Sequence, residues 1–362
     1  MTSDRAEAYA RVIADAGFAG AEAIALAGDA STRRYERLVL NGRTAILMDA
    51  PRSAESGPCP PDAGPEERLR LGWNATSRLA ASRVEAFIAV ADQLRAWGLS
   101  APAIYAADIA AGYAVIEDLG DDLFARVIPA RAGEAALYRA AADVLAHLHR
   151  QTPPARLAAP DGVWPLLDFD ALALQANADL FVDWLPRGTD VRIDDGDRAR
   201  WEQVRDALIA HAMTFQRAFT LRDYHAENLV WLPQRDAIAQ VGLLDFQDAV
   251  RGWRGWDFTM LLHDARRDVG PDGRAAAVDA YLRAGDMSEA AFNEELAILG
   301  ALNVMRILGL FARLVVRDGK PRYADFMPRM WAHLRGALAH PALGEARAFV
   351  RSVAARHLES AP

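Results

Sequence analysis

The spacing of apolar residues changes part-way along the chain, and this change limits the possible fold more than any other feature. Five short segments within the first 122 residues are bounded by turn residues and are typical of strands: 24–29, 34–40, 44–51, 101–108 and 112–122. Asn41-Gly42, between the second and third segments, is a strong signal for a tight hairpin. Residues 1–20 and 76–97 instead repeat apolar positions at helical spacing. We therefore predict an opening helix and a five-stranded antiparallel sheet with one inserted helix.

The rest of the chain is predicted to be mostly helical, with a clear helix over residues 134–150. A chain of 362 residues also exceeds the size at which a single hydrophobic core usually stops growing. The prediction is an α+β protein with two lobes, a small N-terminal lobe over residues 1–120 and a larger, mostly helical lobe over residues 121–362.

Charge and apolar content argue against several functional classes. The formal net charge of −8 disfavours nucleic-acid binding, which depends on lysine and arginine neutralising phosphates. We see no apolar run long enough to cross a bilayer, and the N-terminus lacks the apolar core of a signal peptide. Cys59 is the single cysteine, so an internal disulfide is impossible. We expect a cytoplasmic protein with no nucleic-acid or membrane partner.

Polar residues that could take part in catalysis lie where two short apolar runs meet their flanking loops. The segment LRDYHAENLVWL (221–232) contains Asp223 and Asn228, and in VGLLDFQDAVRG (241–252) Asp245 follows an apolar run directly. Phosphoryl transfer from a nucleotide needs a carboxylate that orients and deprotonates the substrate hydroxyl, and hard oxygen ligands for Mg²⁺. Asp223 fits the first role, and Asn228 and Asp245 fit the second. The alternative is that all three are only turn residues between strands.

The pattern D-x-x-x-x-N followed by a strand-borne aspartate resembles the catalytic and metal loops of protein kinases and aminoglycoside phosphotransferases. This resemblance implies a two-lobed protein-kinase-like fold, with ATP and Mg²⁺ as cofactors. It also implies that Asp257, at the start of a later helix, braces the catalytic loop. Two departures from the kinase pattern are Leu221, where histidine is usual, and Gln247, at the third position of the metal-binding turn.

A phosphate-binding loop is expected near the N-terminus. The segment GDASTRRYERL (28–38) has one glycine where the kinase pattern G-x-G-x-x-G has three. Backbone N–H groups and the hydroxyls of Ser31 and Thr32 can still bind phosphates, and Arg33 or Arg34 can add positive charge. The alternative is an exposed turn with surface arginines.

Two further positions follow from the resemblance to kinases. Met48 stands where kinases place the lysine that pairs with the phosphates, so an arginine must supply that charge if it is supplied at all. Backbone groups of Glu117 and Leu119 are expected to contact the adenine ring, although the segment also reads as an ordinary strand end.

Four polar residues are candidate substrate ligands: His225 and Glu227 in the catalytic loop, Gln247 after Asp245, and Arg306 on a C-terminal helix. A structural hydrogen bond for His225 and a surface position for Arg306 are the alternatives. Trp253 and Trp256 are expected to be packing residues, with a sugar platform as the alternative.

The segments GDASTRRYERL, AILMDAP, LRDYHAENLVWL and LLDFQDAVRG, with LGLFARLVVRDGKPRY (308–323), resemble bacterial anomeric kinases of cell-wall recycling. These enzymes phosphorylate C1 of N-acetylmuramate and N-acetylglucosamine. The resemblance spans about residues 5–345 and implies a sugar substrate, with a sugar-1-phosphate nucleotidyltransferase as the metabolic neighbour.

Two alternatives remain open from the sequence. A kinase for an aminoglycoside, choline or amino alcohol would need acidic residues to pair with a cationic substrate. The C-terminal part offers four such residues: Asp168, Asp170, Asp179 and Asp183. A non-catalytic nucleotide-binding module would explain the missing lysine, but it has no need of Asp223, Asn228 and Asp245 together.

Overall fold

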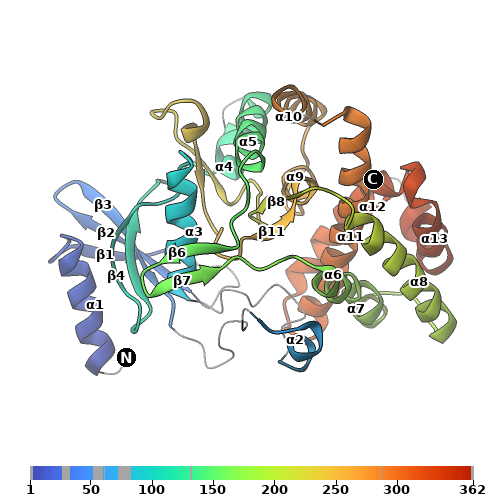
Figure 1. Cartoon of the computed structure of the whole chain (residues 1–362), viewed down its shortest axis with the longest axis horizontal. Coiled ribbons are helices and arrows are strands. Elements are labelled where there is room, and N and C mark those ends of the chain that lie inside the picture. The colour runs from blue at the N-terminus through green and yellow to red at the C-terminus, as the bar shows by residue number, and fades with distance from the viewer. Residues whose placement is uncertain are drawn as a thin grey trace.

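The computed structural model describes residues 3–26, 33–51, 60, 62–71, 83–130, 133–285 and 287–359 (Figure 1). Ser31, Thr32 and Cys59 lie outside these residues. The architecture is α+β, with a five-stranded antiparallel sheet near the N-terminus and a mostly helical remainder, as the sequence predicted.

The sheet has the strand order β1-β2-β3-β5-β4. Its strands are β1 (Glu22–Ala25), β2 (Arg34–Leu40), β3 (Arg43–Asp49), β4 (Ile104–Asp108) and β5 (Tyr113–Glu117). Asn41 and Gly42, with φ of 51° and 78°, join β2 and β3 in the tight turn that this dipeptide favours. The predicted hairpin is therefore confirmed.

One helix covers each face of this sheet. Val12 of α1 (Ser3–Asp15) shares an apolar cluster with Leu47 of β3, whereas α3 (Val84–Ala96) shares a core with the neighbouring Met48. The two faces alternate because successive strand residues point to opposite sides. Met48 is buried in the apolar core, so the position that carries a lysine in kinases supplies no charge here.

The remaining helices build the larger part of the molecule (Figure 1). They are α2 (Pro65–Leu71), α4 (Phe124–Ala130), α5 (Glu134–His149), α6 (Ala171–Ala178), α7 (Leu180–Gly188), α8 (Asp195–Ala212), α9 (Arg254–Leu262), α10 (Pro271–Ala284), α11 (Glu289–Val316), α12 (Met327–Leu338) and α13 (Gly344–Glu359), with 3₁₀ turns η2 (Ala237–Gln240), η3 (Pro321–Phe326) and η4 (Pro341–Leu343). Three strand pairs lie among them: β6 (Arg156–Ala159) with β7 (Gly162–Pro165), β8 (Arg217–Thr220) with β11 (Val250–Trp253), and β9 (Leu229–Trp231) with β10 (Val241–Leu243).

Helix α11 is the central helix of this part, and it packs against α7, α9 and α12. Its length and composition would suffice to cross a membrane, but 72% of its most apolar window is buried inside the molecule. The expectation that no apolar run reaches this length was therefore wrong. A helix surrounded by other helices is apolar on all sides, and this gives it the composition of a membrane span.

Glu295 of α11 holds the first turn of α9. The carboxylate is buried, and its Oε1 accepts a hydrogen bond of 2.8 Å from the backbone N–H of Gly255. Burial raises the pKa of Glu295 to about 7, against the opposing effects of the Gly255 hydrogen bond and of Arg254. In the folded protein this group therefore keeps its proton over a range in which the unfolded chain has lost it.

A pH-dependent stability follows from Glu295. The folded state binds more protons than the unfolded state between the ordinary glutamate pKa and pH 7, so the stability from this group falls as pH rises through that range. We expect Glu295→Gln to remove this pH-dependent loss of stability. At pH 8 the variant should be more stable than the wild type by about 2 kcal/mol, and at pH 4.5 it should show no such gain. Urea unfolding at both pH values tests this, with Glu294→Gln on the same helix as control. The prediction fails if Glu295→Gln and the wild type lose equal stability between the two pH values.

Candidate active site

The loop between β8 and β9 is held in place by Asp257, in the first turn of α9. Asp257 is fully buried, and its two carboxylate oxygens accept hydrogen bonds of 2.8 Å from the backbone N–H groups of Leu221 and Arg222. Arg222 has a positive φ of 75°, a backbone conformation that costs free energy for a residue other than glycine. Asp257 therefore fixes the strained start of the loop that carries Asp223.

The same loop brings Asp223 and Asn228 together. The side-chain amide of Asn228 donates to the backbone oxygen of Asp223 over 2.8 Å, and the backbone N–H of Leu244 donates to the backbone oxygen of Asn228 over 2.9 Å. Strands β9 and β10 are antiparallel, with Leu229 opposite Leu243. Asn228 and Asp245 therefore lie at the same end of this strand pair.

Asp245 receives two side-chain hydrogen bonds on one oxygen. Its Oδ1 accepts from Arg33 Nη2 at 2.8 Å and from Gln247 Nε2 at 3.0 Å. Burial acts to raise the pKa of Asp245, but Arg33, with its charge and hydrogen bond, and Gln247 outweigh it, so the pKa is lowered. Asp245 also has a positive φ of 55°. The carboxylate is therefore held ionised in a strained turn, beside a cation from the N-terminal sheet.

The residues at this end of β9 and β10 suit Mg²⁺. Asn228 and Asp245 offer amide and carboxylate oxygens, the hard ligands that Mg²⁺ prefers. No cluster of three or more histidine, cysteine or acidic side chains suited to a metal occurs in the part of the chain that the structure describes. A pair of protein ligands is typical of Mg²⁺ sites that are completed by nucleotide phosphates and water.

A cavity of about 360 Å³ opens beside this loop. Its lining includes Asp223, His225 and Asp245 and comes also from the end of α9 and the residues after it, from α11 and from η3. The cavity is thus bounded by the proposed catalytic carboxylate and by the central helix.

Arg306 of α11 is a half-buried cation that lines this cavity. Its Nε donates to Asn303 Oδ1 at 2.9 Å, and its guanidinium lies 5.7 Å from the ring centre of Trp256. Burial lowers the pKa of Arg306 to about 10, and the charge of Asp223 opposes this shift. Arg306 therefore stays protonated near neutral pH and faces the same cavity as Asp223.

Three further residues that line this cavity were not among the candidate ligands predicted from the sequence: His263, Asp264 and Arg266. Asp264 is buried, and its Oδ2 has no hydrogen-bond partner among the described atoms. A buried carboxylate oxygen without a donor is a site for a ligand hydroxyl or amide. The missed signal was the polar run that directly follows the apolar end of α9.

The other predicted substrate residues are placed differently. The ring Nε2 of His225 lies 3.4 Å from Asn228 Nδ2, and its buried Nδ1 has no partner among the described atoms. Glu227 is exposed and does not line the cavity. Gln247 is buried and supports Asp245 without lining the cavity. Of the three, His225 alone is positioned to touch a substrate there.

The residues predicted to bind the nucleotide also differ from one another in their surroundings. Arg33 reaches Asp245, whereas Arg34 is exposed. The backbone N–H of Glu117 already donates to the Ala103 oxygen at 2.8 Å, so the backbone of Glu117 would contact a base by accepting a hydrogen bond at its carbonyl oxygen. Leu119 packs in a small apolar cluster with Val230.

The two tryptophans flanking the turn into α9 are packing residues. Trp253 and Trp256 are buried, and both contact the ring of Phe169, with ring centres 5.5 and 4.5 Å apart. The structure therefore confirms the packing interpretation over the sugar platform.

Comparison of the sequence with known families and proteins gives consistent matches. The profile of the phosphotransferase enzyme family matches residues 22–292. A Caulobacter vibrioides protein named N-acetylmuramate/N-acetylglucosamine kinase is 52% identical over 350 residues, covering 96% of each chain. A Pseudomonas aeruginosa protein of the same name is 32% identical, covering 90% of this chain and 86% of the other.

Solved structures with the same fold include a choline/ethanolamine kinase family protein from Mesorhizobium loti. It has a TM-score of 0.56 at 18% identity and covers 97% of this chain and 100% of its own. A streptomycin and ATP complex of the aminoglycoside phosphotransferase APH(2″)-IIa has a TM-score of 0.55 at 14% identity, covering 94% and 98%. At these identities the comparison shows a shared kinase-like fold.

Proposed function

Because the chain belongs to the phosphotransferase enzyme family, we propose that it transfers the γ-phosphoryl group of ATP to the anomeric C1 hydroxyl of N-acetylmuramate or N-acetylglucosamine. The observation that carries this proposal is the placement of Asp223, Asn228 and Asp245 around one loop beside a cavity. The relatives of the same name, at 52% and 32% identity over most of the chain, support the sugar substrate.

In the proposed reaction, Asp223 orients the C1 hydroxyl of the sugar and accepts its proton as the oxygen attacks the γ-phosphorus. The new bond joins C1 oxygen to phosphorus, the bond from the γ-phosphorus to its bridging oxygen breaks, and ADP leaves. Asn228 and Asp245 would hold Mg²⁺, which neutralises charge on the phosphates. Asp257 acts through the backbone of the loop, as a positioning residue.

We propose that residues from separate elements of the cavity lining bind the sugar. Arg306 offers a positive charge and planar N–H donors, which suit a carboxylate such as that of N-acetylmuramate. Asp264 offers a buried acceptor for a sugar hydroxyl, and His225 lies on the same loop as Asp223.

Arg33 is the proposed replacement for the missing lysine. The Met48 side chain is buried in apolar core, whereas the Arg33 guanidinium lies at Asp245, where the phosphates of a metal-bound nucleotide would arrive. The N-terminal lobe that presents Arg33 would end near residue 120, where β5 gives way to α4.

We expect Arg33→Gln to raise the KM for ATP about tenfold, because it removes a charge-assisted hydrogen bond to the phosphates. Steady-state kinetics with varied ATP at saturating Mg²⁺ measures this effect. Arg34→Gln is the matched control, since the neighbouring arginine is exposed, and its KM should stay within twofold of the wild type. A KM for Arg33→Gln equal to that of the control would leave Arg33 with only a structural role.

The rival substrate class is a cationic alcohol, and the acidic residues expected to bind it are engaged elsewhere. Each of the four forms an ion pair with an arginine: Asp168 with Arg251, Asp170 with Arg68, Asp179 with Arg205 and Asp183 with Arg198. None of the four lines the cavity beside Asp223. These four residues therefore give no support to an aminoglycoside or choline as the substrate.

The test is a coupled assay of ADP release with N-acetylmuramate, N-acetylglucosamine, choline and kanamycin. Turnover with the N-acetyl sugars, giving a product without a reducing end, is the expected result. Turnover with the cationic compounds alone would replace the proposal by the rival substrate class, and no turnover with any acceptor would favour a nucleotide-binding module.

We further propose a cytoplasmic role in peptidoglycan recycling. The product would be a sugar 1-phosphate, the substrate class of nucleotidyltransferases that make nucleotide sugars, so such an enzyme is the proposed metabolic neighbour.

A further inference from the structure

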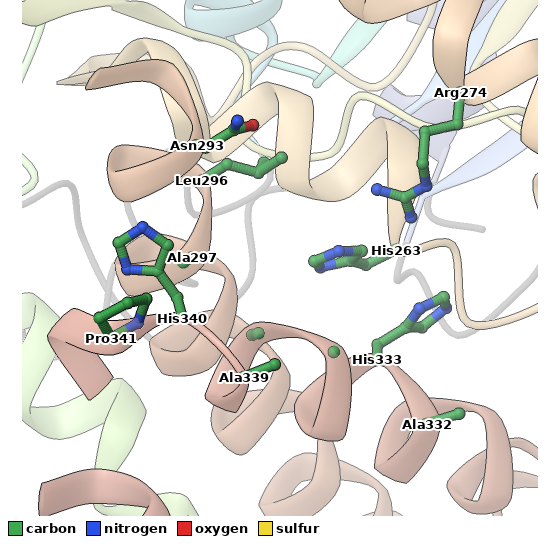
Figure 2. Close-up of a pocket in the computed structure, with 12 residues that line it drawn as sticks. His263, Arg274, Asn293, Leu296, Ala297, Ala332, His333, Ala339, His340 and Pro341 are labelled. Carbon is green, nitrogen blue, oxygen red and sulfur yellow. The ribbon is translucent and has the colours of Figure 1, made fainter. Parts of the chain in front are cut away.

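A second cavity, of about 580 Å³, lies between α10, α11, α12 and the residues that follow α9 (Figure 2). Figure 2 shows Arg274, His263 and His333 gathered on one side, with His340 on the other. The wall between them is apolar and includes Leu296. This cavity has no role in the phosphoryl transfer described above.

Arg274 brings a partly buried positive charge to the cavity, with no counterion among the described residues. Within the described chain, its guanidinium has one hydrogen-bond acceptor, the backbone oxygen of Leu262 at 3.3 Å, and no carboxylate forms an ion pair with it. Burial lowers the pKa of Arg274, because the loss of solvent disfavours the charged guanidinium. An unpaired charge in such a position is costly unless something compensates it.

His263 and His333 stack beside Arg274, with ring centres 4.8 Å apart and planes at 21°. His263 is 8% exposed, and its buried Nδ1 has no hydrogen-bond partner among the described atoms; the same holds for Nε2 of His333. Two ring nitrogens thus remain unsatisfied at the wall of one cavity. The Nδ1 of His263 is a hydrogen-bond donor in one tautomer, whereas the neutral His333 ring places its proton on the nitrogen that faces the Asp264 backbone oxygen, so His333 Nε2 donates only when the ring is protonated.

The charges around these rings are dominated by cations. Burial, its neighbour His333 and Arg274 all lower the pKa of His263. Burial and Arg274 lower the pKa of His333 to about 4, against a backbone hydrogen bond to Asp264 and the charge of Asp268. Asp268 is itself paired with Arg329, with Oδ1 2.7 Å from Nε. An anion in the cavity would supply the negative charge that this side lacks.

We propose that this cavity is a second ligand site that binds a small phosphomonoester, with its phosphate held by Arg274, His263 and His333. A phosphate presents three terminal oxygens and close to two negative charges, which match the Arg274 guanidinium and the ring N–H of His263; the same negative charge favours protonation of His333, whose Nε2 then donates as well. The organic part of the ligand would lie along the apolar wall toward His340. Binding makes and breaks no covalent bond.

His263 connects the two cavities, because it also lines the cavity beside Asp223. A ligand that holds the His263 ring in the second cavity therefore also fixes part of the lining of the cavity beside Asp223. The proposal itself concerns binding, and it stands whether or not the chain phosphorylates a sugar.

The experiment is titration calorimetry at pH 7 with glucose 6-phosphate and, separately, inorganic phosphate, with ADP and Mg²⁺ present throughout to fill the nucleotide site. The proteins are the wild type, Arg274→Gln on α10 and His333→Asn on α12. Arg283→Gln is the matched control, since it makes the same change at an exposed position of α10.

We expect glucose 6-phosphate to bind the wild type and Arg283→Gln with equal affinity, and the two cavity variants at least tenfold more weakly, a change of about 1.4 kcal/mol. Arg274→Lys should retain most of the affinity, because it keeps the charge. Tighter binding of glucose 6-phosphate than of phosphate identifies an organic phosphomonoester as the ligand, and equal binding of both identifies free phosphate.

Equal affinity in all the variants, or no binding of either compound to the wild type, would overturn the proposal. Thermal unfolding checks that each variant is folded. The two cavity substitutions lie on different helices, so His333→Asn carries the test if Arg274→Gln does not fold.

Discussion

Asp223→Asn is expected to lower kcat about 10³-fold while leaving the KM for ATP within threefold of the wild type. The substitution keeps the size of the side chain but removes the carboxylate that accepts the proton of the sugar hydroxyl, a contribution of this order in general-base catalysis. Asp223 lies beside the cavity, whereas Asn228 and Asp245 provide the metal ligands, so nucleotide binding should persist. Steady-state kinetics with N-acetylmuramate and ATP provides the measurement.

The control for this variant is Asp236→Asn, an exposed aspartate in the connection between β9 and β10. Its kcat should equal that of the wild type within twofold. If Asp223→Asn retains more than a tenth of the wild-type kcat, Asp223 is not the base.

Asp257→Ala is expected to destabilise the protein by about 4 kcal/mol. The change leaves the buried N–H groups of Leu221 and Arg222 without acceptors, each at a cost of about 1–3 kcal/mol, and removes the brace that holds Arg222 at positive φ. Urea unfolding gives the free energy of unfolding directly. Activity should fall as well, because the loop that carries Asp223 loses its fixed start.

Asp272→Ala, in the first turn of α10, is the matched control for Asp257→Ala. Asp272 is an exposed aspartate at a helix start, so its loss removes only the favourable interaction with the helix dipole, below about 1 kcal/mol. Equal destabilisation in the two variants would show that Asp257 contributes no more than any acidic residue at a helix start.

Local patterns predicted the local structure well. Strand β2 has the bounds expected from the sequence, because Asn41-Gly42 fixes the turn and the flanking apolar residues alternate. The α+β fold class was also predicted correctly. Strands β6 and β7 were missed, because four-residue strands in a segment containing several prolines carry almost no periodic signal.

The candidate site was predictable only where its residues lie close together in the sequence. Asp223 and Asn228 share the loop before β9, and Asp245 follows β10, the strand that pairs with β9. A motif could therefore identify all three residues. Asp264 follows the end of α9 and Arg306 lies on α11, and their meeting at one cavity depends on how these helices pack. Arg33 and Asp245 are 212 positions apart, so the sequence could name both residues but could not pair them.

The central position of α11 has a consequence for how enzymes of this kind can be redesigned. Substrate range usually changes by exchange of surface loops, which tolerate insertions and new side chains at little cost to the fold. Here Arg306 and Ile307 belong to a helix that is packed against α7, α9 and α12. Gly309, one helical turn beyond, lies so close to the backbone of Leu180 that any side chain there would collide with its carbonyl oxygen. Redirecting the cavity to another acceptor from this side therefore means repacking the core, so acceptor range and fold stability would have to be optimised together.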